Sequence, residues 1–328
     1  MPKALITGGA GFIGSHLAEL LLEHGWEVFA LDDLSTGSHE NVTRFDSKPE
    51  FHLVVESVLS PSAVSELVHK CDVVYHLAAA VGVQLIVEKP AHTLVTNIQG
   101  TENVLEYCGR FGKRVLVASS SEVYGDHPEE SPLVEDARRI YGPTTARRWA
   151  YADTKAIDEF LALALHQERG LDCVIARLFN TVGPRQSGQY GNVVPRFVHW
   201  ALAGEPIEVH GDGSQTRCFC HVSDIVRGLK GLMDEPATTG EIFNIGGTDR
   251  ITIAELAERV KQLIGSESEL VFVPYEDVYP RGIEEEMFHR APSTEKIKAA
   301  TGWAPTISLD RVVEDVAEHQ RNQARAAA

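Results

Sequence analysis

Two groups of polar side chains in this sequence could act together on an alcohol. Tyr151 and Lys155 are four residues apart, so a helix would place them on one face, where an ammonium group can lower the pKa of a phenol. A phenolate produced in this way is a general base for an alcohol. Ser120 and Glu122 lie in the run Ser-Ser-Ser-Glu, residues 119–122, directly after a short apolar stretch. That stretch reads as a strand, so these side chains would lie at the edge of a sheet.

A Tyr and a Lys four residues apart also occur as a simple surface contact, so the spacing of Tyr151 and Lys155 alone is weak evidence for catalysis. A glycine-rich turn near the N-terminus supports the catalytic interpretation. Residues 8–14 read Gly-Gly-Ala-Gly-Phe-Ile-Gly, after a short apolar strand and at the start of a helical pattern. The spacing GxxGxxG differs from the common GxGxxG. The physical reason is the same, because glycines let the backbone approach a pyrophosphate while the helix N-terminus supplies free amides.

Asp32 strengthens the interpretation of this turn as a dinucleotide site. It ends the second predicted strand, eighteen residues after Gly14, where a carboxylate can accept hydrogen bonds from ribose hydroxyls. A carboxylate there would repel a 2′-phosphate, which favours NAD over NADP. The alternative is a glycine-rich turn with an unrelated surface Asp, but the two features in register favour a nucleotide.

Short apolar runs alternate with longer stretches of helical period, which indicates an α/β fold with a doubly wound parallel sheet. About six strands are predicted, and the ligand should bind beyond their carboxyl ends. The predicted strands are 4–6, 28–31, 51–55, 73–77, 115–118 and 173–177, with helices that include 13–24 and 101–111.

After about residue 180 the regular alternation of strands and helices gives way to a stretch richer in loops, glycine turns and prolines. A loop-rich stretch covers 181–192, a Gly-Asp-Gly turn covers 211–213, and Pro195, Pro206 and Pro236 suggest helix boundaries. A helix is predicted over 253–264 with a Thr252 and Glu255 capping box, and a last helix over 309–325. We therefore expect an NAD-binding Rossmann domain over 1–180, with return elements from the C-terminal half, and a smaller α/β substrate lobe over 181–328.

Composition limits the partners of this chain. Its 328 residues carry a net charge of −17, which repels nucleic acid and anionic membranes. The five cysteines have neither metal-binding spacing nor a disulfide framework, so we expect reduced thiols and no metal. The N-terminal residues do not have the pattern of a signal peptide, and no apolar stretch reaches the length of a membrane span. These features predict a cytoplasmic protein.

With these motifs in place, the chain resembles the extended short-chain dehydrogenase/reductase superfamily, the NAD-dependent epimerase/dehydratase family of nucleotide-sugar enzymes, over nearly its whole length. The motifs that carry the resemblance are residues 7–14, 76–79, Asn97, 119–125, Tyr151 with Lys155, 179–180, 192–195 and Arg217. The resemblance implies a Rossmann domain with a smaller sugar-nucleotide domain, a tightly bound NAD and a UDP-sugar substrate. It also implies a homodimer that pairs helices of the Rossmann lobe, including the Tyr151 helix.

The resemblance also assigns binding residues. Those expected at the cofactor are Gly8, Gly11, Phe12, Ile13, Gly14, Asp32, Asp33, Ser35, Thr36, Gly37, Ser57, Val58, Leu77, Ala78, Ala79, Asn97, Tyr151 and Lys155. Those expected at the substrate are Val83, Asn180, Arg185, Val193, Arg217 and Arg290. One departure concerns Ser57, because the family often has an Asp near the adenine at this position.

The reaction in such enzymes begins when the tyrosine, here Tyr151, takes the proton of the C4 hydroxyl, Ser120 shares the hydrogen bond and hydride passes from C4 to NAD. The branch follows the 4-keto intermediate. Similar 4,6-dehydratases carry Asp-Glu where this chain has Ser121 and Glu122, so dehydration is disfavoured. Simple 4-epimerases generally carry a small neutral residue in place of Glu122.

Decarboxylation of UDP-glucuronate offers a role for Glu122, because a 4-keto uronate is a β-keto acid. By resemblance to UDP-glucuronate decarboxylases, Glu122 would orient or repel the carboxylate, while Arg290 and Ser121 would bind the acid or protonate C5. Arg185 could also face the carboxylate. Glu122 could instead be a buried structural carboxylate and Arg290 a surface ion-pair partner. The alternative functions are a UDP-glucuronate or UDP-glucose 4-epimerase and a nucleotide-binding regulator without turnover.

Overall fold

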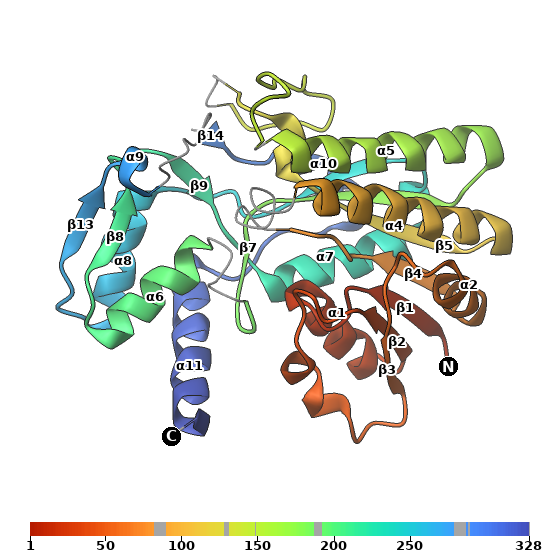
Figure 1. The fold of residues 1–328 in the computed structure, drawn as a ribbon, viewed down its shortest axis with the longest axis horizontal. Helices are drawn as coiled ribbons and strands as arrows, with labels where there is room; N and C mark the ends of the chain where they lie inside the picture. Colours follow the sequence, from red (N-terminus) through yellow and green to blue (C-terminus); the bar gives the residue numbers. More distant parts are fainter. Residues whose placement is uncertain are drawn as a thin grey trace.

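A seven-stranded parallel sheet forms the centre of the larger lobe, in the order β11-β6-β5-β4-β1-β2-β3 (Figure 1). The computed structural model describes residues 1–81, 90–127, 131–147, 149–186, 192–278, 287 and 289–327. The strands are β1 Lys3–Thr7, β2 Glu27–Asp32, β3 Phe51–Val55, β4 Val73–His76, β5 Arg114–Ser120, β6 Cys173–Leu178 and β11 Ile242–Ile245. The predicted α/β fold with a parallel sheet is therefore confirmed.

Helices cover both faces of this sheet, and together they form the sheet lobe. Alternate residues of β1 show the two faces, because Leu5 packs in one core with Val64 and Val104, whereas Ile6 packs in the other with Leu17. Buried apolar side chains on both faces explain why the strands read as short apolar runs. The helices on the Leu5 face are α2 Pro61–Lys70, α4 Pro90–Phe111 and α5 Trp149–Arg169; those on the Ile6 face are α1 Phe12–Glu23, α7 Val222–Asp234 and α10 Glu295–Thr301.

A separate apolar core holds a smaller lobe, which lies to the left of the sheet in Figure 1. Val198, Val260 and Val316 contribute to this core from three different helices. The elements of this small lobe are α6 Val193–Ala203, β8 Ile207–His210, α8 Ile253–Ile264, β13 Leu270–Val273 and α11 Leu309–Ala327. Short strands join the lobes: β7 Thr181–Val182 with β10 Cys220–His221, and β9 Thr216–Cys218 between β12 Arg250–Thr252 and β14 His289–Arg290.

Short helical segments complete the described chain. They are η1 His39–Asn41, η2 Thr43–Phe45, η3 Ser121–Tyr124, η5 Pro236–Thr238 and α9 Tyr275–Val278. Of these, η3 matters most for the site, because it follows β5 at the carboxyl edge of the sheet and carries Glu122.

Most predicted elements agree with the structure, with two corrections. The helix predicted from residue 101 begins at Pro90, so α4 is twice the expected length. The sheet has a seventh strand, β11, which comes from beyond residue 180 and pairs with β6 in parallel. The capping box is confirmed, because Thr252 and Glu255 each accept the other's backbone N–H at the start of α8.

Candidate active site

The glycine-rich turn joins β1 to α1 at the carboxyl edge of the sheet. Gly8 has φ of +72°, a left-handed conformation that favours glycine, and its carbonyl accepts a hydrogen bond from the Gly11 N–H at 3.1 Å. A side chain at Gly14 would place its Cβ 2.1 Å from that same carbonyl oxygen. No side chain caps α1 and its first turn holds no acid. The amides at this end, which carry the positive end of the helix dipole, are therefore suited to a diphosphate.

Asp32 lies beside this turn with its carboxylate anchored by backbone amides. Its Oδ2 accepts from Ala10 N–H and its Oδ1 from Leu34 N–H, both at 2.9 Å. Burial raises the pKa of Asp32, and these amide hydrogen bonds act in the opposite direction. A Cβ at Gly37 would lie 2.8 Å from Oδ1, so glycine leaves that face of the carboxylate open. A carboxylate next to a diphosphate cradle fits the adenosine half of NAD.

Other residues expected at the cofactor line the neighbouring strand ends. Asp33 folds its own loop, because its Oδ1 accepts from both the N–H and the hydroxyl of Ser35. Ser57 donates its N–H to Glu56 at 2.8 Å, and Val58 is buried against α4. A carboxylate therefore does lie beside position 57, one residue earlier than the family pattern expects.

Asn97 connects the loop after β4 to the helix that carries Tyr151. Its Oδ1 accepts from Ala80 N–H at 2.7 Å, and its Nδ2 donates to Ala80 O and to Thr154 Oγ1. Thr154 in turn donates to the carbonyl of Tyr151 at 2.7 Å. The loop that includes Leu77, Ala78 and Ala79 is thus held in place relative to α5.

Tyr151 lies in the first turn of α5, within hydrogen-bonding reach of Ser120, and is only 7% exposed. Burial raises the pKa of Tyr151, the negative charges of Glu122 and Asp158 raise it further, and Ser120 and Arg290 oppose the shift. This differs from the sequence-based expectation that Lys155 lowers this pKa. The reason is that the environment of the phenol is dominated by burial and by carboxylates.

Lys155 has a carboxylate partner that the sequence reasoning missed. Its Nζ lies 3.1 Å from Oδ2 of Asp158, three residues further along α5, and both side chains are almost completely buried. The i to i+3 spacing was visible in the sequence, but only the structure shows that this face of the helix is covered. Asp158 therefore joins the candidate site.

Glu122 and Arg290, which the resemblance assigned to the substrate carboxylate, contact each other between η3 and β14. Arg290 Nη1 lies 3.5 Å from Glu122 Oε1, and its Nη2 donates to Asn180 Oδ1 at 2.9 Å. The Glu122 and Arg290 side chains are 23% and 11% exposed, so neither a fully buried structural carboxylate nor a surface ion pair describes them. Arg217 is aligned with Arg290 in the pairing of β9 with β14. The Glu122 carboxylate, the Asn180 amide and the Arg290 guanidinium group thus gather in one place, and the charges of Glu122 and Arg290 act on the Tyr151 phenol.

Three expected substrate residues are not placed with this cluster. Arg185 pairs with Glu19 on α1 and has φ of +67°, so it faces that helix instead of Arg290. Val193 begins α6 and packs against the core of the small lobe. Val83 lies outside the described residues. Ser121 is buried, 2% exposed, directly after the Ser120 side chain that accepts the Glu122 N–H.

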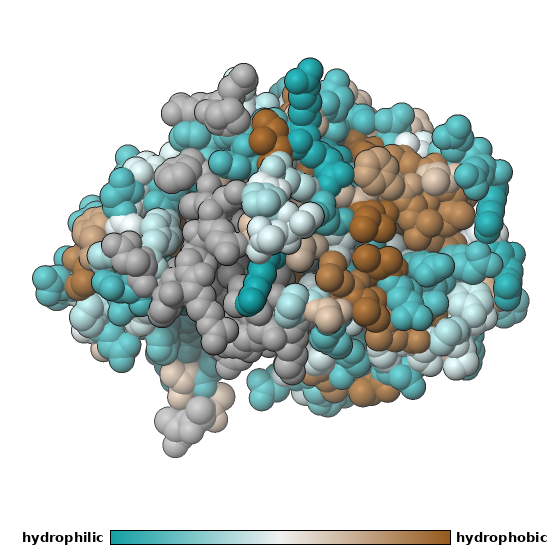
Figure 2. Space-filling view, turned by 45° about the horizontal axis from the view of Figure 1, so that its top comes forward, coloured by the Kyte–Doolittle hydropathy of each residue, from teal (hydrophilic) through white to brown (hydrophobic). Residues whose placement is uncertain are grey.

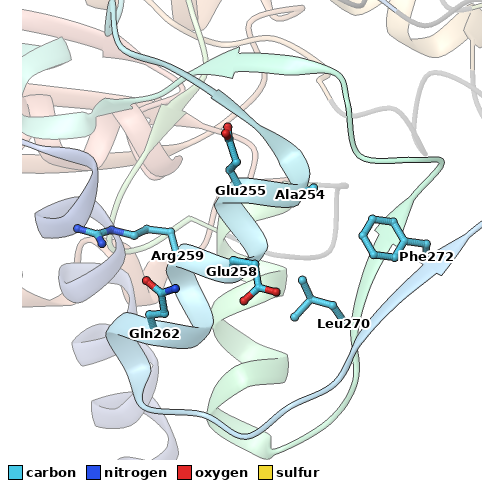
Figure 3. A pocket seen from close by; sticks show the side chains of 7 residues that line it. All are labelled: Ala254, Glu255, Glu258, Arg259, Gln262, Leu270 and Phe272. Carbon is cyan, nitrogen blue, oxygen red and sulfur yellow. The ribbon is translucent and has the colours of Figure 1, made fainter.

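A groove of about 420 Å³ on the small lobe contains none of the expected site residues. It lies between α8 and β13, as Figure 3 shows, with Glu258 and Leu270 on its opposite sides. Within the described residues, no helix is long and apolar enough to cross a membrane and no cluster of His, Cys, Asp or Glu could hold a metal ion.

A parallel sheet with a glycine-rich turn, an acidic second strand end and a Tyr-Lys helix at one edge defines an NAD-binding oxidoreductase fold with an added substrate lobe. The chain belongs to the NAD dependent epimerase/dehydratase family, whose model matches residues 4–246. NAD is the cofactor of that family, and the residues of the cofactor end fit it.

Known relatives share nearly the whole length of the chain. It is 42% identical over 317 residues to a UDP-N-acetyl-alpha-D-glucosaminuronate decarboxylase of Bacillus cytotoxicus, covering 95% of this chain and 96% of that protein. A UDP-glucuronic acid decarboxylase of Arabidopsis thaliana is 39% identical, with 94% and 85% covered. The UDP-glucuronic acid 4-epimerase of Bacillus cereus, solved with UDP-glucuronic acid and NAD, is 28% identical with a TM-score of 0.87, covering 98% and 99%.

Proposed function

We propose that this protein is an NAD-dependent UDP-glucuronate decarboxylase that acts through a 4-keto intermediate. The observation that carries the proposal is the Arg290 side chain between Glu122 and Asn180, close enough to Tyr151 to act on its phenol. A guanidinium group there can hold a sugar carboxylate next to the base that oxidation at C4 needs. The decarboxylase relatives over 94–95% of the chain support the same reaction.

The chemistry divides among the residues of the site. NAD, when bound, supplies the hydride acceptor for C4. Tyr151 takes the proton of the C4 hydroxyl while Ser120, within hydrogen-bonding reach of the phenol, holds that hydroxyl. The resulting β-keto acid loses its C6 carboxylate as carbon dioxide when the C5–C6 bond breaks. The enolate left behind takes a proton at C5, for which Ser121 and Arg290 are the candidate sources.

Glu122 acts at the decarboxylation step in this proposal. Its carboxylate pairs with Arg290 when no sugar carboxylate is present. An entering uronate therefore competes with Glu122 for the same guanidinium group, and the two negative charges repel each other. Loss of carbon dioxide moves one of these charges from the carboxylate to the enolate oxygen at C4, and the later protonation at C5 neutralises it, so repulsion of the carboxylate by Glu122 favours this step.

Three further assignments belong to this proposal. Asn180 and Arg217 contact the nucleotide diphosphate, and the residues of the glycine-rich turn and Asp32 hold NAD. The protein is cytoplasmic. It is a homodimer that pairs α4 and α5, because Val95, Ile157 and Phe160 project from these helices with exposures of 53%, 42% and 62%. Figure 2 shows apolar side chains gathered over this part of the sheet lobe.

Two alternative activities each have a specific observation in their favour. The relative of Bacillus cytotoxicus favours UDP-N-acetylglucosaminuronate as the decarboxylated substrate. The 4-epimerase of Bacillus cereus shares the fold, and an arginine beside the sugar could instead hold the carboxylate still while the 4-keto sugar turns over.

The test is to incubate the purified protein with NAD and each of the two UDP-uronates, and to follow the products by mass spectrometry and proton NMR. Loss of the mass of carbon dioxide from UDP-glucuronate is the expected result. Loss of that mass only from the N-acetyl substrate would move the assignment to that sugar. An unchanged mass with an inverted C4 would establish a 4-epimerase, and tight NAD binding without any product would establish a regulator.

A further inference from the structure

An ion pair between Lys155 and Asp158 lies inside α5, next to the proposed base. The Lys155 and Asp158 side chains are 4% and 1% exposed, and 3.1 Å separates Nζ from Oδ2. Two charges this deeply buried lose their hydration, and each compensates the other for that loss. Removing one of them leaves an uncompensated buried charge, which destabilises the fold. Both residues come from one rigid helix, which fixes their geometry relative to Tyr151.

A chain of polar side chains leads from this pair towards the glycine-rich turn. The Thr101 hydroxyl faces the Asp158 carboxylate and hydrogen bonds to Nε2 of His76 at 3.0 Å. Nδ1 of His76 hydrogen bonds to the Thr7 hydroxyl at 2.8 Å. Burial lowers the pKa of His76 to about 3, and the charge of Lys155 lowers it as well, so this imidazole is neutral near pH 7. Lys155 and Asp158 are the charged members of this chain.

The charges that face Tyr151 come from three elements. Glu122 on η3 and Asp158 on α5 are negative, and Arg290 on β14 is positive. Glu122 and Arg290 pair with each other, so their effects on the phenol partly cancel. Glu159, the next acid on α5, acts elsewhere, because it holds Arg177 and accepts from Ser119 at 2.5 Å.

We propose that Asp158 is a positioning residue that holds the Lys155 ammonium within α5 and, by its own negative charge on the Tyr151 face of that helix, sets the pH range in which Tyr151 acts as a base. This inference rests on the proposed function for the role of Tyr151. Residues 151, 155 and 158 are spaced i, i+4 and i+7 along α5, so they lie on one face of that helix. A carboxylate on this face disfavours a phenolate at Tyr151. Asp158 therefore keeps Tyr151 protonated to higher pH than the Tyr-Lys pair alone would.

The first test compares pH profiles of kcat/KM for the NAD-loaded wild type and Asp158→Asn. The isosteric amide removes the negative charge, so the acidic limb of the profile should move to lower pH by about one unit. Asp153→Asn is the matched control, because Asp153 is a half-exposed carboxylate on the same helix and pairs with Arg139. The acidic limb of the Asp153→Asn profile should stay at the wild-type pH. An unmoved limb in Asp158→Asn would contradict the proposal even if turnover fell.

The second test needs no substrate and covers the case in which Asp158→Asn folds poorly. Thermal unfolding is measured for Asp158→Asn, Lys155→Met and the double variant. Each single change leaves one buried charge alone and should lower Tm by about 5 °C or more, whereas the double variant should recover most of that loss. Additive losses would show that the two charges are not partners and would overturn the proposal.

The two proposals fail in different ways. If the function is wrong, the wild type does not convert either UDP-uronate, while the unfolding cycle still shows coupling between Lys155 and Asp158. If the inference is wrong, the wild type turns over normally but the cycle is additive or the limb does not move.

Discussion

In the proposed function, Glu122 and Arg290 act on the same substrate as Tyr151, because the charges of both side chains act on the Tyr151 phenol at the carboxyl edge of the sheet. Arg290 is shared between Glu122 Oε1 and Asn180 Oδ1, and Asn180 also donates to Cys218 O at 2.9 Å. A guanidinium group with one charged and one neutral hydrogen-bonding partner is held in place before substrate arrives. In the proposed function, the exchange of Glu122 for a sugar carboxylate at Arg290 is the step that separates decarboxylation from simple oxidation.

Glu122→Gln should uncouple these two steps. The amide cannot repel the substrate carboxylate, so carbon dioxide release should fall about 100-fold while oxidation at C4 changes much less. Single-turnover absorbance of NADH and release of labelled carbon dioxide measure the two steps separately. Tyr151→Phe is the matched control and should lose both. Equal losses in Glu122→Gln would remove Glu122 from the step after oxidation.

Arg290→Ala should discriminate between sugars. Losing a charged hydrogen bond to the carboxylate should raise KM for UDP-glucuronate about 10- to 100-fold, with little effect on the affinity for UDP-glucose. Calorimetric titration with both nucleotides gives the comparison. Arg250→Ala, on β12 at the far side of β9, is the control. If both sugars weaken alike, Arg290 is a general contact to the nucleotide.

The sequence predicted candidate site residues that belong to a recognisable motif. It did not predict residues whose importance depends on which other parts of the chain pack against them. Tyr151 could be predicted from its spacing to Lys155 on a helix, and Ser120 and Asp32 from their positions at the ends of strands. Asp158 could not, because a carboxylate three residues after a lysine is usually an exposed helix pair, and only the packing of α4 over α5 buries this one. Arg185 was expected to face the sugar carboxylate, but its direction depends on how the loop around it folds, which the sequence does not show. In the structure it pairs with Glu19 on α1.

At the scale of elements, apolar periodicity predicted the strands well because most of them are buried on both faces, although the edge strand β3 is only partly buried. Periodicity failed at the start of α4, because the buried positions there, Thr93, Asn97 and Gly100, are polar or small and form no apolar stripe. It also failed to place β11, since a strand that returns from residue 242 to pair with β6 depends on long-range contacts. Only the tertiary fold decides which sheet such a strand joins.

Asp224 on α7 holds the segment before α11 against the sheet lobe. Its Oδ2 accepts from the N–H groups of Thr306 and Ile307 at 2.7 and 2.9 Å, and Arg227 pairs with it. Burial alone would raise the pKa of Asp224, but these hydrogen bonds keep it below its usual value. The charged carboxylate thus stabilises the fold above about pH 4.

Asp224→Asn should therefore destabilise the protein by roughly 3 kcal/mol at pH 7. A folded pKa below the unfolded one means that the wild-type advantage is lost as pH falls below about 4. Urea denaturation at pH 7 and at lower pH measures this difference. Asp212→Asn, an exposed turn carboxylate, should have little effect. A loss for Asp224→Asn that stays constant with pH would show that the charge is not responsible.

At the scale of the whole molecule, the site exists only where the two lobes meet. Tyr151 and Glu122 come from the sheet lobe, whereas Arg290 and Arg217 come from the paired strands β14 and β9 beside the small lobe. Residues 168 positions apart in the sequence thus contribute to one site, as the 3.5 Å contact of Glu122 with Arg290 shows. Sequence could predict the members of this site by family resemblance, but not their contacts.

The outer face of α4 and α5 should hold two copies of the chain together. Val95, Ile157 and Phe160 are large apolar residues that are exposed there, and such a cluster usually marks an interface. Phe160→Asp would place a charge in the centre of that face. We expect the wild type to be a dimer by size-exclusion chromatography with light scattering, and Phe160→Asp to be a monomer with unchanged NAD binding. Phe272→Asp, at another exposed position, on β13, should remain dimeric. A monomeric wild type, or a dimer that survives Phe160→Asp, would exclude this face as the interface.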